Sequence, residues 1–221
     1  MICVHTLVRN GEDYIKPCLE SVLPYVDRAL VMVDGRSNDS TIDILSDMTT
    51  KYKNLEVMVA PITCPETDLI KLRNEQIRHT KEQWVWIVDS DEYYPKQVVD
   101  EVLEAVNGPY DTLALNSWAV WDKEQYHVST SKIPSGRVFL NNNLEWVGKF
   151  GKEMLYSGYI KLWDKDDPRE GVKILESRYI HLTHIKKDSW RKEMGQERRA
   201  DGRHLRSLPE GIIKELGKIY A

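Results

Sequence analysis

Residues 84–91 read Trp-Val-Trp-Ile-Val-Asp-Ser-Asp, a run of apolar residues that ends in two aspartates separated by a serine. The apolar residues predict a strand over 84–88 that is buried on both faces, as the central strands of parallel sheets are. In open parallel sheets, ligands bind beyond the carboxyl ends of the strands. The position of Asp89 and Asp91 therefore predicts a binding site at the rim of an α/β sheet.

Upstream of this run, strand-like and helix-like patterns alternate. Strands are predicted over residues 2–8, 29–33 and 55–60, and helices over residues 13–23, 41–52 and 68–80. A further helix is predicted to begin at Pro95 and to run to residue 106. Strands separated by helices indicate parallel βαβ units, so we expect an α/β fold with a mostly parallel, Rossmann-type central sheet flanked by helices.

Downstream of Pro109 the pattern becomes irregular. Short strands are predicted over residues 112–120, 137–140 and 172–182, joined by loops rich in aromatic residues, and residues 186–206 form a charged helical pattern. We find no internal repeat and no linker. We therefore expect a single domain over residues 1–221, with a sheet-and-helix half (1–108), an irregular half (109–185) and a basic helical tail with a C-terminal helix (186–221).

The composition is that of an ordinary soluble globular protein, with 41% hydrophobic and 30% charged residues. A formal net charge of −4 argues against a surface built entirely for nucleic acid. The three cysteines show no metal-ligand spacing, which predicts reduced thiols in a cytoplasmic protein. No leader and no run of about 20 apolar residues is present, so any membrane contact is expected to be peripheral.

The aspartates after the central strand suggest a metal site. Successive strand residues alternate faces, so Asp89 and Asp91 should point the same way and Ser90 elsewhere. Two converging carboxylates repel each other unless a cation joins them. A hard divalent ion suits oxygen ligands and could bridge to the diphosphate of a bound nucleotide. The alternative is a solvated acidic turn, because this short pattern arises often by chance.

A second acidic position follows the strand predicted over residues 29–33. Asp34 opens a polar loop, and its carboxylate could accept hydrogen bonds from a nucleobase or ribose. Gly35 would let the backbone approach a ligand closely. Asp39 lies in the same loop, but capping of the next helix explains an acid there equally well.

Several segments resemble motifs of family 2 glycosyltransferases. Residues 4–12 and 18–23 resemble the first strand and helix of that family. Residues 33–41 resemble its nucleotide-binding loop, with one residue inserted after Asp-Gly. Residues 73–75, Arg-Asn-Glu, resemble its Arg-Asn segment, and residues 87–92 resemble its metal motif.

This resemblance implies a GT-A fold, a nucleoside-diphosphate sugar donor (a UDP-sugar above all), Mn²⁺ or Mg²⁺, and transfer with inversion. It places Asp34 on the base, Asp89 near the ribose and metal, and Asp91 on the metal. The first half of the chain would then bind the nucleotide sugar and the second half would face the acceptor. The nucleotide-sugar-binding residues predicted in this way are Thr6, Val8, Asn10, Glu12, Asp34, Arg36, Ser37, Asp39, Arg73, Asp89 and Ser90.

The resemblance also implies a late histidine on the metal or the diphosphate. His181 and His184 both follow the strand predicted over residues 172–182, and we favour His181. Neutral imidazole can ligate such metals, although it suits softer ions better than Mg²⁺. A surface histidine is the alternative for either position.

Inverting transfer needs a base that accepts the proton of the acceptor hydroxyl. The Arg-led strand at Arg137, the Trp-x-Gly at residues 146–148 and the acid that follows resemble the acceptor side of the family. Glu153 is the first candidate base, although Lys152 stands where the family often has a histidine. Asp122 is the second candidate. An exposed structural acid is the alternative for both.

The tryptophans and the tail admit more than one interpretation. Trp118, Trp121 and Trp146 could stack on sugar rings, but core packing is the more usual role of an aromatic residue. The tail over 186–206 could be a solvated helix, a lid, a membrane-surface helix or a nucleic-acid contact.

Three functions remain open at this point. A metal-dependent glycosyltransferase is favoured, with a glycan, lipid-linked sugar, protein or modified nucleic acid as acceptor. A sugar-nucleotide nucleotidyltransferase, or a non-catalytic nucleotide-sugar or nucleic-acid binding module, is the alternative.

Overall fold

A computed structural model describes residues 1–60, 65–127, 134–148, 154–158, 160–162, 171–182 and 205–220, without the side chains of residues 65–68 and 160. Its first half contains β1 (Ile2–Val8), α1 (Ile15–Glu20), the 3-10 helix η1 (Leu23–Tyr25), β2 (Arg28–Asp34), α2 (Thr41–Lys51), β3 (Leu55–Ala60), α3 (Pro65–Arg78), β4 (Trp84–Ile87), β5 (Glu92–Tyr93) and α4 (Lys96–Ala105). Its second half contains β6 (Thr112–Val120), β7 (Gln125–His127), β8 (Ser135–Leu140), β9 (Leu144–Val147), β10 (Met154–Ser157), β11 (Ile160–Lys161), β12 (Val172–His181), β13 (Leu205–Ser207) and α6 (Glu210–Ile219).

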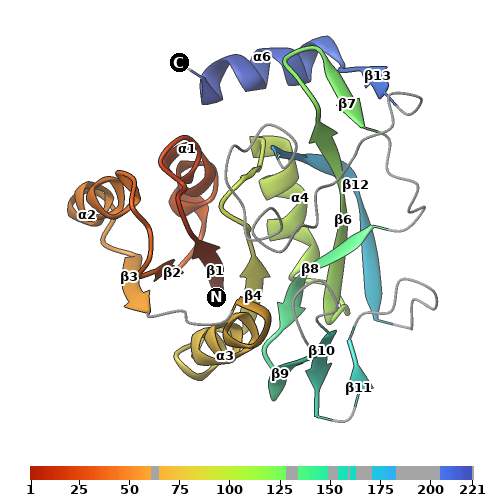
Figure 1. Ribbon diagram of the computed structural model, residues 1–221. Coiled ribbons are helices and arrows are strands. Elements are labelled where there is room, and N and C mark those ends of the chain that lie inside the picture. The colour runs from red at the N-terminus through yellow and green to blue at the C-terminus, as the bar shows by residue number, and fades with distance from the viewer. Residues whose placement is uncertain are drawn as a thin grey trace.

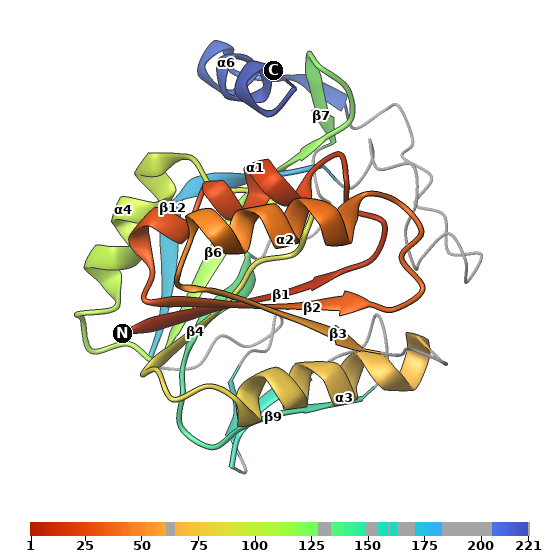
Figure 2. The ribbon, with the colours of Figure 1, turned by 90° about the vertical axis from the view of Figure 1, so that its left-hand side faces the viewer.

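The first half is a parallel sheet in the order β3-β2-β1-β4. Helices α1, α2 and α4 cover one face of the sheet and α3 covers the other (Figures 1 and 2). The chain reverses its direction of progress across the sheet between β1 and β4, and α/β sheets of this type bind ligands beside such a point. The predicted α/β fold with a Rossmann-type parallel half is therefore confirmed.

The second half extends the same sheet with mixed strand directions. β8 is antiparallel to β4 and to β6, and β12 runs parallel to β6. β7 and β13 continue the sheet at one end, while β9, β10 and β11 form a separate small sheet near α3 (Figure 1). β5 is a short strand that pairs antiparallel with the end of β12.

The main core lies between the sheet and the helices α1, α2 and α4. β4 contributes to both faces of the sheet, because Trp86 packs into this core while Val85 and Ile87 pack into a second cluster with Phe139 and Leu155. All the residues of β4 are buried, as predicted for a central strand. α6 packs separately, through Leu216 and Ile219, onto Tyr14 and Ile180.

Some local predictions were wrong. The first helix is shorter than residues 13–23, because α1 ends at Glu20 and a separate 3-10 turn follows it. Leu205 and Arg206 belong to strand β13 and not to a helical tail, because their main chains pair with β7. The rest of the predicted charged helix, residues 186–204, lies outside the described residues. The predicted C-terminal helix is present as α6.

Asp89 and Asp91 do not lie in a strand, contrary to the prediction from alternating faces. β4 ends at Ile87, and Asp89, Ser90 and Asp91 lie in a turn closed by a 3.0 Å hydrogen bond from the amide of Glu92 to the carbonyl of Asp89. The alternation of faces in a strand therefore does not apply to Asp89 and Asp91. Within the described ranges, no helix is both long and apolar enough to span a bilayer.

His5 should make the fold sensitive to acid. Its side chain is wholly buried in β1, 2.6 Å from the hydroxyl of Thr80, and burial together with the charges of Arg73 and Arg28 lowers its pKa to about 3. An unfolded histidine titrates near 6.5, so between these pH values only the unfolded chain binds the proton. The free energy of unfolding should therefore fall by about 1.4 kcal/mol for each unit of pH decrease within this window.

Urea unfolding from pH 7 to pH 5 tests this expectation, because most carboxylates stay ionised there. His5→Gln removes the titrating group and should flatten the dependence of unfolding free energy on pH relative to the unsubstituted protein. Equal slopes in the two proteins would show that His5 is not the source of the acid sensitivity.

Candidate active site

The loops that follow β1 and β2 are joined into one structure at the carboxyl edge of the sheet. The Gly11 amide donates to the Thr41 hydroxyl at 2.7 Å, and the Glu12 amide donates to Asp39 Oδ2 at 3.0 Å. In return, the Ser40 amide donates to Glu12 Oε2 at 3.0 Å. Glu12 and Asp39, both predicted to bind the nucleotide sugar, thus hold the two loops together. Asp39 Oδ1 also accepts from the Thr41 amide, two residues on. The N-cap of α2 is Ser40, and no side chain caps it, so the predicted capping role of Asp39 is not observed.

Asn10 completes this contact between the loops. Its φ of 47° lies in the left-handed region, which asparagine tolerates better than most residues. Its side-chain oxygen accepts from the Asn38 amide at 3.0 Å, and its own amide donates to the Ser37 hydroxyl at 3.4 Å. Asn10 and Ser37, two further predicted binding residues, therefore lie side by side at the rim.

Asp34 lies at the end of β2, with its carboxylate buried and bound by arginine. Arg36 donates to it from the amide (2.9 Å), from Nε (3.1 Å) and from a terminal nitrogen (2.8 Å), and Arg9 Nε lies 3.8 Å away. Burial opposes ionisation, but these hydrogen bonds and charges outweigh it and hold the pKa of Asp34 below its usual range. A nucleobase could reach this carboxylate only if Arg36 moved aside.

Thr6 and Val8 lie within β1, and their side chains are buried. The Thr6 carbonyl accepts a 3.0 Å hydrogen bond from the side-chain amide of Gln76, which also donates to the Leu30 carbonyl at 2.8 Å. Gln76, buried on α3, thereby attaches that helix to both β1 and β2. Thr6 and Val8 support the rim from beneath, and their side chains are not exposed to a ligand.

Asp89 lies between two arginines. Arg73 of α3 donates to Oδ1 at 2.8 Å, and Arg137 of β8 donates to Oδ2 at 2.9 Å. Burial opposes ionisation of Asp89, but the charges of Arg137 and Arg73 hold its pKa well below the usual range. Arg73 was predicted at this site, whereas Arg137 was considered only as a marker of the acceptor side.

Beneath Asp89 lies a fully buried carboxylate, Glu92, paired with Arg137. Glu92 Oε2 accepts from the Asp89 amide at 3.0 Å and from the Tyr94 hydroxyl at 2.9 Å. The Tyr179 hydroxyl accepts from Arg137 Nε at 3.2 Å. Burial raises the pKa of Glu92, and the charge of Arg137 opposes this rise. The positive charge of Arg137 thus compensates the negative charges of two carboxylates, Asp89 and Glu92.

Asp91 faces His181. Its Oδ1 lies 3.6 Å from Nε2 of His181, and both side chains are largely but not wholly buried. The pairing of β5 with β12 brings them together, because His181 lies opposite Glu92 and the Leu182 amide donates to the Asp91 carbonyl at 2.8 Å. Of the predicted metal ligands that the structure describes (Asp89, Asp91 and His181), Asp91 and His181 lie close enough to bind one ion together.

A divalent ion fits this pair as a partial ligand set. Ligand atoms at about 2.0–2.2 Å from one ion lie roughly 3 Å apart, close to the observed separation. In the parts of the chain that are described, no group of three or more His, Cys, Asp or Glu side chains could hold a metal alone. Mg²⁺ and Mn²⁺ sites that use one or two protein ligands and substrate phosphates have this character.

Other predicted residues lie elsewhere. Glu153 and His184 fall outside the described residues. Asp122 Oδ1 accepts from the amides of Glu124 (2.8 Å) and Gln125 (2.7 Å), so this carboxylate stabilises the turn between β6 and β7. Ser90 is buried in the turn between Asp89 and Asp91.

Trp146 is the tryptophan that lies against Arg73 of α3. Its amide donates to Asn74 Oδ1 at 2.7 Å, its carbonyl accepts from Asn74 Nδ2 at 2.9 Å, and the Arg73 guanidinium lies 5.7 Å from its ring centre. These contacts attach β9 to α3. Trp118, near the carboxyl end of β6, and Trp121, directly after that strand, are half-buried.

Sequence reasoning missed Arg137, Glu92 and Tyr179 as one charged cluster. Glu92 directly follows Asp89-Ser90-Asp91 in the sequence, but the order of residues there does not indicate that its side chain is buried. Arg137 reaches Asp89 because β8 pairs antiparallel with β4, with Val138 opposite Trp86. Arg137 and Asp89 are 48 residues apart in the sequence, and only the pairing of β8 with β4 shows that they are neighbours.

A parallel sheet with acidic and basic side chains at its switch point defines an α/β protein of the nucleotide-binding type. The family model for glycosyl transferase family 2 matches residues 3–167, and the chain belongs to this family. The resemblance stated from the motifs is therefore confirmed.

Among curated proteins, the chain is similar to a poly(ribitol-phosphate) beta-glucosyltransferase of Bacillus spizizenii, with 34% identity over 90 residues. It is also similar to the prophage-derived glycosyltransferase SunS of Bacillus subtilis, with 28% identity over 95 residues. These matches cover 39% and 41% of this chain but only 14% and 20% of the respective relatives.

Among solved structures, the fold is similar to S. aureus TarS 1–349 in complex with UDP-GlcNAc, with a TM-score of 0.59 and 17% identity. That alignment covers 100% of this chain and 70% of TarS 1–349. TarS 1–349 in a second structure gives a TM-score of 0.55 and 16% identity, with 99% and 70% of the two chains covered. The predicted GT-A-like fold is confirmed.

Proposed function

We propose that this protein transfers a sugar from a nucleoside-diphosphate sugar to an acceptor hydroxyl. Membership of glycosyl transferase family 2 supports transfer, and similarity to a fold solved with UDP-GlcNAc supports a UDP-sugar as donor. The observation that carries the proposal is the convergence of Asp91, His181 and the arginine-bound Asp89 where β1 and β4 end. The nucleotidyltransferase and binding-module alternatives are not favoured by the family match.

In this proposal the nucleotide lies along the joined loops after β1 and β2. Asp34 receives the base once Arg36 has moved, and Asn10 and Ser37 line the path toward the diphosphate. Asp91 and His181 hold Mn²⁺ or Mg²⁺. That ion, when bound, supplies positive charge to the diphosphate oxygens. Asp89 is already held by two arginines, whose positive charges disfavour a cation beside it, so we place Asp91 and His181 first.

At the sugar, the proposed chemistry is a direct displacement. The acceptor oxygen forms a bond to C1 of the donor sugar as the bond from C1 to the diphosphate oxygen breaks, which inverts the anomeric centre. The nucleoside diphosphate leaves with the bonding electrons, and electrostatic stabilisation of this leaving group is expected to be the largest catalytic contribution. A carboxylate takes the hydroxyl proton. We retain Glu153 for this role, because the carboxylate of Asp122 is engaged in a turn.

Thermal unfolding with UDP, GDP, dTDP and CDP, each with and without Mn²⁺, tests the donor site. We expect UDP with Mn²⁺ to raise the melting temperature most. At a nucleotide concentration of 100 Kd, the gain in unfolding free energy should be about 2.7 kcal/mol. Asp91→Ala should abolish the part of this gain that depends on metal.

Asp100→Ala is the matched control, because Asp100 is an exposed acid on α4 that pairs only with Lys96 among described residues. It should keep the full metal-dependent gain. If no nucleotide stabilises the protein at concentrations well above millimolar, the proposed donor site is wrong. Release of pyrophosphate from the donor, in place of a nucleoside diphosphate, would refute glycosyl transfer.

A further inference from the structure

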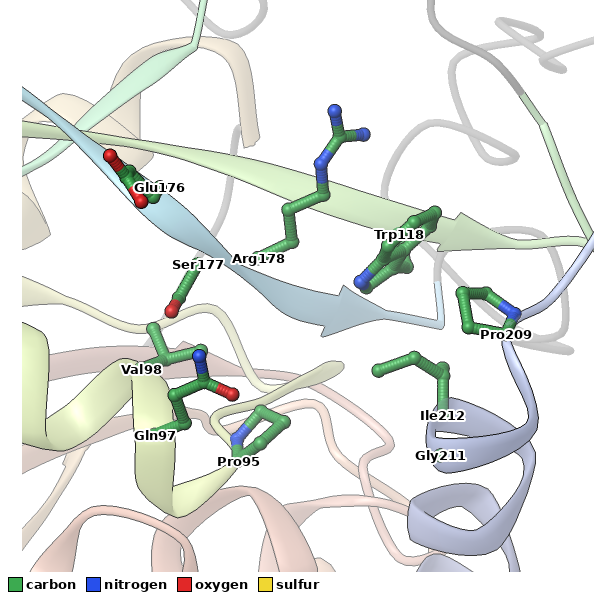
Figure 3. A pocket seen from close by; sticks show the side chains of 10 residues that line it. All are labelled: Pro95, Gln97, Val98, Trp118, Glu176, Ser177, Arg178, Pro209, Gly211 and Ile212. Atoms are coloured by element: carbon green, nitrogen blue, oxygen red, sulfur yellow. The ribbon is translucent and has the colours of Figure 1, made fainter.

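A cavity of about 320 Å³ lies between the beginnings of α4 and α6 and the strands β6 and β12. Figure 3 shows side chains from all these elements around it. It lies apart from Asp34, Asp89 and Asp91, none of which lines it. Its size is at the lower end of the usual range for small-molecule sites, about 300–1,000 Å³.

The pairing of β12 explains why the cavity is there. β5 covers the edge of β12 only at Tyr93 opposite Ile180 and Glu92 opposite His181. Pro95, which has no amide hydrogen to donate, then turns the chain away into α4. The edge of β12 before Ile180 is therefore not covered by β5.

The wall of the cavity on β12 is held by hydrogen bonds. The register of β12 on β6 shifts between Ile174 and Arg178, which marks an irregular stretch of strand. Glu101 of α4 accepts from the amides of Glu176 (2.7 Å) and Ser177 (2.9 Å) within this stretch. These bonds fix the direction of the side chains that line the cavity.

The polar lining contains both donors and acceptors. It includes Gln97, Ser177 and the indole of Trp118. Glu176 and Arg178 border the cavity from β12 with exposed side chains, and Figure 3 shows the guanidinium of Arg178 directed away from Gln97 and Ile212. Arg178 lies 4.8 Å from the centre of the Trp118 ring and forms no ion pair with any described residue. Figure 3 shows the indole nitrogen on the side of Trp118 that is turned toward the other lining residues. Because Glu176 and Arg178 are exposed, the polar groups that remain at the cavity are the uncharged ones of Gln97, Ser177 and Trp118.

The remaining lining is apolar and includes Pro95, Val98, Pro209 and Ile212. A sugar ring presents apolar C–H groups on its faces and hydroxyl groups at its edge, and a pocket with an apolar wall and several polar groups matches both. A phosphate or other anion would need an excess of cations at the cavity, whereas its one basic lining residue, Arg178, is accompanied by one acidic residue, Glu176, and both are exposed.

We propose that this cavity binds an uncharged pyranose unit of the acceptor. Arg178 precedes His181 by three residues on β12, a distance of about 10 Å along an extended strand. An acceptor saccharide with one unit in the cavity can therefore place a neighbouring unit near the Asp91–His181 pair. The role of this saccharide as acceptor rests on the proposed glycosyl transfer, but its binding can be measured without a donor.

The two exposed glycines of α6 provide a matched pair of variants. A Cβ atom added at Gly211 or at Gly217 would meet no heavy atom within 4 Å. Gly211 lines the cavity and Gly217 does not. Gly211→Tyr should fill the cavity without straining the fold, and Gly217→Tyr adds the same side chain to the same helix elsewhere. Both replacements should favour the helix, because glycine is a poor helix former.

The probe is the indole ¹⁵N–¹H resonance of Trp118, assigned through Trp118→Phe. The methyl glycosides of glucose, galactose and N-acetylglucosamine, together with inorganic phosphate, are titrated to about 20 mM, well above the usual upper KM of about 1 mM. We expect a saturable shift with at least one glycoside, weakened at least about tenfold in Gly211→Tyr and unchanged in Gly217→Tyr. UDP stabilisation is measured on the same samples.

Each result decides between the two proposals. UDP binding without any glycoside shift overturns the sugar site and leaves the donor site standing. A saturable response to phosphate but to no glycoside identifies an anion site and also overturns the proposal. A glycoside shift that Gly211→Tyr leaves intact places the sugar elsewhere. Glycoside binding without any response to UDP upholds the cavity as a sugar site and counts against the proposed transfer.

Discussion

Replacing Arg137 by methionine is expected to lower the free energy of unfolding by about 3–5 kcal/mol, because it leaves buried acids without their cation. Arg137 is largely buried and binds Asp89, Glu92 and the Tyr179 hydroxyl. Glu92 is fully buried, so water cannot replace the lost partner. Urea unfolding at pH 7 measures the loss.

Two further variants show whether charge or packing is responsible. Adding Glu92→Gln to Arg137→Met removes a buried acid whose ionisation is no longer compensated, and it should recover part of the lost stability. Arg137→Lys keeps the charge but not the fork that reaches both carboxylates, so it should still be destabilising. Lys96→Met, at an exposed pair with Asp100, should leave stability unchanged. An Arg137→Met protein as stable as the original would show that these acids do not depend on Arg137.

Asp91→Asn is expected to lower kcat/KM by about 10²–10³-fold, the usual cost of losing one preorganised electrostatic contact to a developing charge. The substitution keeps the size of the side chain and its proximity to His181. It removes the negative charge that would hold a divalent ion against the diphosphate. The rate is measured as release of UDP from the UDP-sugar that gives the highest wild-type rate.

A dependence on Mn²⁺ separates a ligand from a purely structural residue. If Asp91 binds the metal, a higher Mn²⁺ concentration should restore part of the rate of Asp91→Asn. A structural defect would not respond to Mn²⁺. Asp100→Asn is the matched control and should retain the wild-type rate. Full activity of Asp91→Asn at low Mn²⁺ would remove Asp91 from the metal site.

The first half of the fold follows from local patterns. The apolar runs over β1, β2, β3 and β4 match the predicted strands to within a residue or two. For β1, β2 and β4 the reason is that strands buried on both faces must be largely apolar along their length, whereas β3 is a partly exposed edge strand. The rule that connected parallel strands present their carboxyl ends at one edge then brings Asp34 and Asp89 to the same rim. Neither inference requires knowledge of a distant contact.

The second half was less accessible to local reasoning. β5, β7, β10 and β11 are short, and their pattern is too brief to distinguish from loops. Their formation depends on pairing with strands elsewhere in the chain. The end of β4 was also hard to predict from the sequence. Asp89 and Asp91 lie in a turn that is stabilised by hydrogen bonds between Asp89 and Glu92, and not in a continuation of the strand.

The sequence by itself determined the α/β class, the order of strands and helices in the first half, the family, and the rim position of the acidic run. These depend on periodicity and on short motifs, which are local properties of the chain. Only the tertiary structure decided that Arg137 and Arg73 hold Asp89, that Asp91 meets His181, and that a separate cavity opens beside β12. The physical reason is that each of these contacts joins elements distant in sequence, and its partner is set by strand register and burial.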